Sequence, residues 1–269
     1  MPEPALIREC VHRNNAGPVN IHFHNAYELL FIKNGRVRLT VSGIDYDGGP
    51  GSLFVLGRFE EHTLTILSEE YDRWFLIINP DRIGQLITER RLLSPLRNRP
   101  EAFTHRFDLS AVQARVERLF ARLLEECQSP GAFAELMQMS LLNELLILIY
   151  RANPSGRQRE QPVPPAVLAV QTYIEGHYAE PLSISDLASR VFMSSCHLSH
   201  LFKASTGYSP KQYLVLHRLA GAKQLLSETD FPIAEVALRS GYTDVNNFIR
   251  TFRKETGLTP LAYRRRQFD

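Results

Sequence analysis

Three histidines and one glutamate in the first quarter of the chain have the residue types and the spacing of a binding site. His22, His24 and Glu28 read H-x-H-x3-E, and His62 follows further along. On a continuous strand, positions 22, 24 and 28 face the same side. Imidazole and carboxylate groups together suit Zn, Fe, Mn, Co or Ni. Because such groups are costly in an apolar interior unless they are paired or bound, the pattern predicts a shared site for a metal or a polar small molecule.

The last hundred residues contain a tandem repeat. Residues 184–213 align with residues 233–263 at an offset of 49, which becomes 50 after one inserted residue. Each copy reads as a short helix, a tight turn and a second helix that ends at Gly207 or Gly257, a pattern typical of the helix-turn-helix motif. The helical stretch 211–228 between the copies spans roughly 27 Å at 1.5 Å per residue. A rod of this length can hold two recognition helices about 34 Å apart, near one turn of DNA.

This repeat resembles the DNA-binding domain of the AraC/XylS family of bacterial transcription regulators. The resemblance covers residues 166–269 and rests on LSHLFKASTGYSP, RLAGAKQLL and IAEVALRSGYTDVNNFIRTFRKETGLTPLAYRR. It implies two helix-turn-helix motifs, over 184–207 and 233–257. In the first motif, Phe192 stands where the family usually has Gly, and His200 stands where Arg is common.

The resemblance also implies which side chains touch DNA. The base-reading positions are Cys196, Ser199, His200, Val245, Asn246 and Arg250, and the phosphate-contacting ones are Lys203, Lys211, Arg253 and Lys254. Arg bonds guanine and Asn bonds adenine bidentately, whereas Cys and Val offer only apolar contact, for instance to a thymine methyl. The alternative is that these residues are merely exposed on their helices.

The histidine-rich segment, together with Pro50-Gly51 and the later histidine, resembles the two cupin motifs. AraC-like regulators often carry a cupin-like domain that binds a small effector, frequently a sugar. The resemblance implies an effector site lined by His22, His24, Glu28, His62 and Trp74, with the indole stacked on a sugar face. For the first four residues two alternatives stay open: a pocket-lining or structural role without metal, and a divalent metal site.

The elements that must position these residues change in character along the chain. Residues 1–108 contain short alternating runs such as 36–41, punctuated by turn residues such as Asn34-Gly35, which predicts an all-β barrel. Helical periodicity follows over 111–128 and 133–151, and the second stretch is apolar over more than one face. The predicted fold is a cupin-like β-barrel with helices, followed by an all-α domain. The predicted boundaries are 1–108 for the barrel, 109–152 for a helical dimerisation segment, 153–165 for a linker and 166–269 for the DNA-binding domain.

Composition excludes several classes of protein. The 269 residues are 44% hydrophobic and 22% charged, with a net charge of +2, as in an ordinary folded protein. Three scattered cysteines form no CxxC pair, which favours a reducing compartment. No apolar run reaches the ~20 residues of a membrane span. The chain also lacks a phosphate-binding glycine loop, a nucleophile elbow and an HExxH motif. We therefore expect a cytoplasmic protein that does not bind membranes.

These observations and the resemblance predict a sequence-specific DNA-binding transcription regulator controlled by a small molecule such as a sugar. The resemblance implies an activator, the commoner role in the family, and repression stays open as the alternative. The expected partners are double-stranded DNA, the effector, RNA polymerase and a second copy of the chain. The main alternative is a metal-dependent cupin enzyme fused to a DNA-binding module. A further alternative is a constitutive nucleoid-type binder with a vestigial sensor domain.

Overall fold

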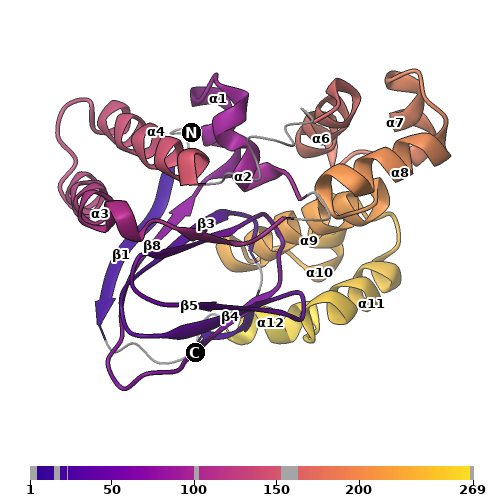
Figure 1. Ribbon diagram of the computed structural model, residues 1–269. Helices are drawn as coiled ribbons and strands as arrows, with labels where there is room; N and C mark the ends of the chain where they lie inside the picture. The colour runs from indigo at the N-terminus through magenta and orange to yellow at the C-terminus, as the bar shows by residue number, and fades with distance from the viewer. Residues whose placement is uncertain (1–4, 15–18, 23, 100–102, 153–162, 267–269) are drawn as a thin grey trace. The chain divides into compact units, whose positions relative to one another are not determined.

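The computed structural model of the chain forms two compact units, Met1–Pro162 and Val163–Asp269 (Figure 1). The described residues are 5–14, 19–22, 24–99, 103–152 and 163–266. Residues 153–162, most of the predicted linker, lie outside them. Within the described ranges, every helix is too short or too polar to cross a membrane.

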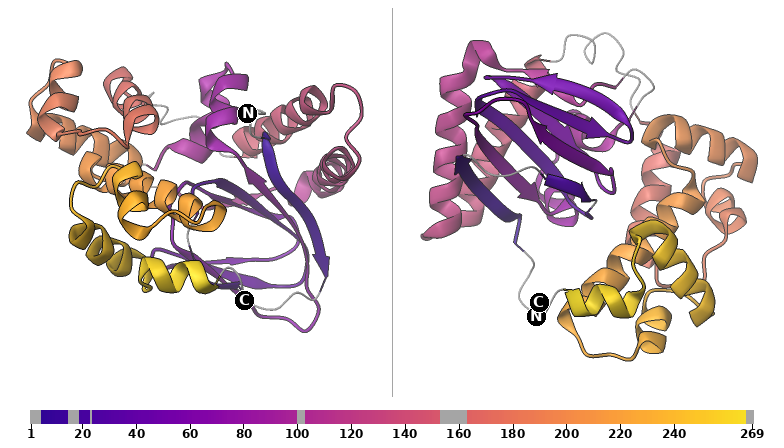
Figure 2. Two further views of the ribbon diagram at one scale, coloured as in Figure 1. Left: turned by 180° about the vertical axis from the view of Figure 1, so that it is seen from behind. Right: turned by 90° about the horizontal axis from the view of Figure 1, so that it is seen from below.

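The first unit is built on two antiparallel sheets that pack face to face (Figure 2). One sheet has the order β1-β8-β3-β6-β9 and the other the order β2-β7-β4-β5. The strands are β1 (Ile7–Asn14), β2 (Val19–His22), β3 (Tyr27–Asn34), β4 (Val37–Val41), β5 (Ile44–Gly48), β6 (Ser52–Leu56), β7 (His62–Ile66), β8 (Asp72–Ile78) and β9 (Arg106–Asp108). The expected hairpin turn lies between β3 and β4, where Gly35 has φ +87° and a Cβ would lie 2.3 Å from the Glu70 carbonyl oxygen. The two sheets confirm the predicted sheet-rich fold of this domain.

The central strands β8, β3 and β6 of the five-stranded sheet are buried on both faces, and this explains their continuous apolar runs. On β3, Leu30 and Ile32 face the second sheet, where they join the interior core with Leu39 and other residues. Leu29 and Phe31 alternate with them and face a separate outer core. The buried residues of β3 therefore divide between the interior between the sheets and the layer between sheet and helices.

Helices cover the outer face of the five-stranded sheet (Figure 2). They are α1 (Pro80–Leu86), η1 (Arg90–Leu93), α2 (Ser94–Arg97), η2 (Ser110–Val112), α3 (Gln113–Gln128) and α4 (Ala134–Ala152). Leu142 and Leu146 of α4 are fully buried in this outer core. The broad apolar surface predicted for this helix is therefore used largely within the unit itself.

All regular secondary structure in the described part of the second unit, Val163–Arg266, is helical. Its helices are α6 (Pro165–His177), α7 (Ile184–Arg190), α8 (Ser195–Thr206), α9 (Pro210–Glu228), α10 (Ile233–Arg239), α11 (Val245–Thr256) and α12 (Pro260–Arg266). The pairs α7/α8 and α10/α11 are the two predicted helix-turn-helix motifs, and α9 is the rod between them. Both second helices end at a glycine in the left-handed conformation, Gly207 with φ +81° and Gly257 with φ +73°.

Candidate effector site and DNA interface

Three of the five predicted site residues of the barrel, His24, Glu28 and His62, lie together around the carboxylate of Glu28. His24 Nε2 lies 3.0 Å from Glu28 Oε2, and His62 Nε2 lies 3.4 Å from the same oxygen. Glu28 is on β3 with the parity of the interior residues Leu30 and Ile32. His62 begins β7 of the opposite sheet and is 4% exposed. The cluster therefore joins the two sheets across the interior.

The backbone elements that bring these side chains together differ from the single strand face predicted from the sequence. β2 ends at His22 and β3 starts at Tyr27, so His24 lies in the connection between them. The backbone of His22 pairs with that of His62, but the side chain of His22 lies outside what the structure describes. The chain turns between His24 and Glu28, and the turn rather than strand parity brings their side chains together.

The charges of the cluster are interdependent. Burial alone raises the pKa of Glu28, but hydrogen bonds from His24 and His62 and their charges outweigh burial and hold it well below its usual value. Burial likewise lowers the pKa of His62, yet the hydrogen bond and charge of Glu28 raise it overall. The favoured state is a carboxylate facing imidazoles, at least one of which readily accepts a proton.

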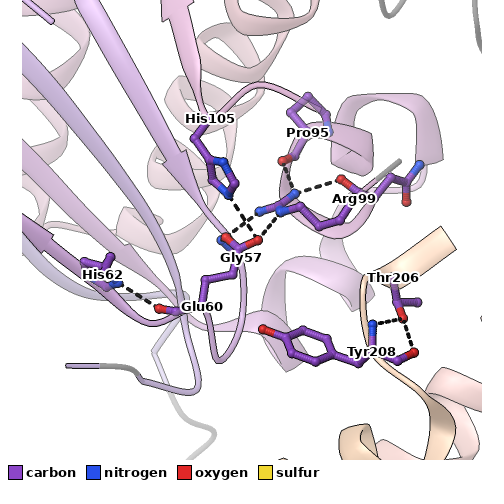
Figure 3. A network of polar contacts seen from close by, with 9 residues as sticks. Gly57, Glu60, His62, Pro95, Arg99, His105, Thr206 and Tyr208 are labelled. Carbon is purple, nitrogen blue, oxygen red and sulfur yellow. Dashed lines mark hydrogen bonds and ion pairs between the residues drawn. The ribbon is translucent and has the colours of Figure 1, made fainter. Parts of the chain in front are cut away.

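Glu60 fixes the orientation of His62 through its backbone carbonyl, and its buried carboxylate forms a second network (Figure 3). His62 Nδ1 lies 2.8 Å from the carbonyl oxygen of Glu60, so it donates there and leaves Nε2 directed at Glu28. The Glu60 carboxylate accepts from the Gly57 amide at 2.5 Å and from both Nε and Nη2 of Arg99, and His105 Nε2 lies 3.2 Å from it. Sequence analysis missed this network, because a single Glu in a loop and a distant Arg form no spacing pattern.

The predicted sugar-stacking residue lies elsewhere. Trp74 on β8 pairs with Phe31 of β3 and belongs to the outer core, 7% exposed. Its ring stacks on His12 at 4.1 Å and approaches Phe120 of α3 at 6.0 Å. The structure therefore does not bring Trp74 together with the histidine cluster, because consecutive strand residues face opposite sides of a sheet.

The two recognition helices, α8 and α11, begin with side-chain caps. Ser194 accepts from the amide of His197 at 3.2 Å, and Asp244 accepts from the amide of Asn246 at 2.8 Å. Of the predicted DNA-contacting residues, the exposed ones are Cys196, His200, Lys203, Lys211, Asn246, Arg250, Arg253 and Lys254, and the partly buried ones are Ser199 and Val245. Val245 packs against the core of the second motif. Most of the predicted contact residues thus lie on accessible helix surface.

Two further residues share this exposed surface and were missed from the sequence. Asn247 accepts from Arg250 Nη2 at 3.2 Å, so it orients the guanidinium, and His197 occupies the aligned position in the first motif. The sequence contained a signal for this contact, because Asn247 and Arg250 are three residues apart and such residues are neighbours on a helix surface. Each of the two exposed helix surfaces therefore contains at least one polar residue beyond those predicted to contact DNA.

The turn of the first motif contains a strained and exposed aromatic residue. Phe192 has φ +55° and is 98% exposed, whereas Gly241 has φ +85° at the equivalent place in the second motif. Glycine adopts positive φ without steric cost. We expect Phe192→Gly to raise the free energy of unfolding by about 0.5–1 kcal/mol, because relief of strain exceeds the added flexibility of the unfolded chain. Urea unfolding measures this change.

Gly241→Ala is the matched opposite substitution. A Cβ there would lie 2.7 Å from the Tyr178 carbonyl oxygen, so the variant should be clearly destabilised. A loss of stability in Phe192→Gly would contradict the interpretation of the turn as strained.

Comparison with known proteins finds a family match for each unit. Residues 5–146 match the family described as AraC-like ligand binding domain, and residues 187–266 match a helix-turn-helix domain. The Arabinose operon regulatory protein of Escherichia coli K12 is 33% identical over 155 residues, which are 57% of this chain and 52% of that protein. The probable transcriptional regulator LumQ of Photobacterium leiognathi is 31% identical over 153 residues, 57% of this chain and 61% of that protein. The matched regions thus span only half to three-fifths of these relatives.

A solved structure of ToxT from Vibrio cholerae has the same fold, with a TM-score of 0.61 at 15% identity over 95% of this chain and 97% of that one. The ligand-binding family match covers more than half of the chain, and the helix-turn-helix match covers most of the rest. The chain therefore belongs to the AraC family, whose members join an AraC-like ligand binding domain to a helix-turn-helix DNA-binding domain.

Proposed function

We propose that this protein is a sequence-specific DNA-binding transcription regulator, and that a small molecule in the β-barrel controls it. The observation that carries the proposal is the pair of helix-turn-helix motifs with capped recognition helices and exposed Asn, His, Arg and Lys side chains. The named relatives are regulators of transcription, which agrees with this function. The finer proposal is an activator that acts on RNA polymerase in the cytoplasm and performs no catalysis.

The test is selection of bound sequences from fragmented genomic DNA with the purified full chain, followed by footprinting. A specific regulator protects defined half-sites, each read by one recognition helix, about one helical turn apart. Uniform protection along the DNA would contradict specific regulation and favour a constitutive nucleoid-type binder.

We further propose that the effector binds between the sheets, at His24, Glu28 and His62. One protein of this fold, ToxT from Vibrio cholerae, has been solved with a bound unsaturated fatty acid. A ligand controls DNA binding only if it binds one arrangement of the protein more tightly than another. Its hydroxyl or amine groups would satisfy a buried carboxylate and two imidazoles.

The double substitution His24→Ala with Glu28→Gln is expected to abolish induction in a reporter strain and to leave DNA affinity intact, because the sensor and the recognition helices are separate units. The matched control is His12→Ala with Asp72→Asn, which removes another histidine–carboxylate pair, at 2.6 Å, on β1 and β8. Unchanged induction together with a lower melting temperature would assign a purely structural role to the His24–Glu28 pair.

A divalent metal is a second candidate for this site. The ligand atoms of His24, Glu28 and His62 lie within 4.8 Å of one another. His62 also donates from its other ring nitrogen to a backbone carbonyl, the usual outer contact of a metal-bound histidine. Calorimetric titration of the protein with Zn²⁺ tests whether it binds a divalent metal. Turnover by the loaded protein would favour the alternative of a cupin enzyme fused to a DNA-binding module.

We also propose that the protein forms a homodimer through α4. Its buried leucines are unsuited to the test, but Phe133, Leu136 and Met137 at its start are 81%, 54% and 39% exposed. Leu136→Glu is expected to shift sedimentation of the full chain from dimer to monomer, because it puts charge into an apolar interface. Leu261→Glu, an exposed leucine of the second unit at 48%, is the control. A monomeric native chain would contradict this proposal.

A further inference from the structure

A buried arginine of the barrel faces the same side of the sheet as the histidine cluster. Arg73 of β8 is 5% exposed. It lies directly opposite Ile32 of β3, an interior residue, and residues directly opposite share a face. Its neighbours two positions away, Tyr71 and Phe75, also pack in the interior core. Arg73 therefore carries its charge into the space between the sheets, where the proposed function does not use it.

The charge of Arg73 lacks a counter-charge within the described part of the chain. Its Nη1 donates to the Tyr71 hydroxyl at 3.3 Å, and its guanidinium lies over the rings of Tyr71 and Phe75 at 5.5 and 5.6 Å. Its Nε is buried and has no hydrogen-bond partner among the residues that the structure describes. Among the described residues, no carboxylate oxygen lies within 4.0 Å of it. A buried charge is costly unless it is paired and hydrogen-bonded.

A second arginine adds to this positive charge. Arg13 of β1 lies directly opposite Arg73 in the antiparallel pairing of β1 with β8, strands that lie side by side in Figure 1. Its guanidinium lies over the same Phe75 ring, at 5.4 Å. Like charges directly opposite each other on neighbouring strands are destabilising. Arg13 is exposed, so a ligand that reaches both arginines would approach from the rim of the sheet.

We propose that Arg13 and Arg73 bind the oxyanion of a small molecule, a carboxylate or a phosphate. Guanidinium groups present N–H donors in a planar fork that matches both oxyanions. Tyr71 adds a donor, because burial raises the pKa of its phenol to about 12 and keeps it protonated. The anion neutralises the two opposed cations and occupies the hydrogen-bonding capacity of Arg73.

This anion site is separate from the histidine cluster. Ile32, opposite Arg73, is four residues along β3 from Glu28, which is about 13 Å at 3.3 Å per residue. The interior face of β3 between these two ends contains Leu30, which pairs with Phe75 of β8. The two sites are therefore offset along β3, although the charge of the Glu28 carboxylate reaches the Tyr71 phenol and raises its pKa. The proposal that these arginines bind an anion does not depend on the proposed function. The proposal that this anion belongs to the effector rests on the proposed function.

The experiment compares inorganic phosphate, benzoate and the neutral analogue benzyl alcohol as probes for the native full-length chain, at constant ionic strength with chloride as the balancing anion. We expect phosphate or benzoate to raise the melting temperature in a saturable way, as a ligand of the folded state does, and benzyl alcohol to leave it unchanged. The stronger of the two anions identifies the source of the oxyanion.

Arg73→Met should weaken binding of that anion by about tenfold or more, since it removes charge-assisted hydrogen bonds. Without anion, the variant should melt at or above the native temperature, because an uncompensated buried charge has been removed. A merely structural arginine would instead lower it. Arg13→Met should also weaken binding. Arg38→Met, which removes a strand arginine already paired with Asp47 at 2.7 Å, should leave it unchanged.

Two results would contradict the anion site. One is an equal rise in melting temperature for native protein and Arg73→Met when the anion is added. The other is no rise in native protein beyond that in chloride alone. DNA affinity is then measured with and without the stronger anion. Anion binding without an effect on DNA affinity would keep the site and remove its role as effector site. Induction by a ligand that binds equally well to Arg73→Met would keep the proposed function and overturn this inference.

Discussion

Glu60→Gln is expected to lower the free energy of unfolding by about 3 kcal/mol or more at neutral pH, because it leaves a buried arginine without its counter-charge. Arg99 has an exposed side-chain fraction of 10% and Glu60 one of 8%, so water does not replace the missing carboxylate. The substitution also weakens the amide and imidazole interactions with the same side chain. Urea unfolding of native and variant protein measures the difference.

The same network predicts acid lability. Burial raises the pKa of Glu60, but the charge of Arg99 and hydrogen bonds from His105 and Arg99 outweigh burial and lower it well below 4.5, its ordinary value. The stabilisation is fully present above 4.5 and is lost as the pH falls toward the lowered pKa of the folded state. The native protein should therefore lose stability below pH 4.5 more steeply than Glu60→Gln.

Glu144→Gln is the control for both measurements. Glu144 pairs with Arg115 at 2.7 Å, but both side chains are more than a third exposed, so its loss should cost about 1 kcal/mol or less. Equal effects of the two glutamate substitutions would contradict the importance of burial in the Glu60 network.

Arg250→Ala is expected to weaken binding to the selected DNA site by about 1–3 kcal/mol and to relax base preference at one position. The Arg250 guanidinium is exposed on α11 and oriented by Asn247, which suits it to the two acceptors of a guanine edge. Affinity for the site and for a scrambled duplex of equal length is measured by fluorescence anisotropy over a range of salt concentrations.

Lys254→Ala is the contrasting variant on the same helix. Removing an ammonium group that binds a phosphate weakens binding to both duplexes alike and reduces the salt slope by about one. If Arg250→Ala behaves in the same way, Arg250 contacts phosphate and not bases.

The helical half of the fold was predictable because its signals are local. Ser194, Asp244, Gly207 and Gly257 specify the ends of α8 and α11 through caps that depend on a few neighbouring residues. The tandem repeat contains the same motif twice, so each copy supports the interpretation of the other. The presence of Phe192 at positive φ shows that the turn is set by the surrounding helices and not by the turn residue itself.

The barrel site was predictable in composition but not in construction. The convergence of His24, Glu28 and His62 followed from their residue types, but the turn after His22 and the pairing of distant strands decide their positions. The placement of Trp74 depends on whether both faces of its strand are buried, which a continuous apolar run cannot reveal. The opposed Arg13 and Arg73 become neighbours only through β1–β8 pairing, which joins segments about sixty residues apart.

The three cysteines differ sharply in accessibility, and this gives the molecule a natural reporter of DNA occupancy. Cys10 is buried, and burial raises its pKa to about 12; burial also raises the pKa of the half-buried Cys127. Thiolate is the reactive form, so both should resist alkylation. Cys196 is exposed on α8 among the residues proposed to face DNA. A maleimide fluorophore should therefore label the first recognition helix selectively, and bound DNA should shield that thiol from the reagent.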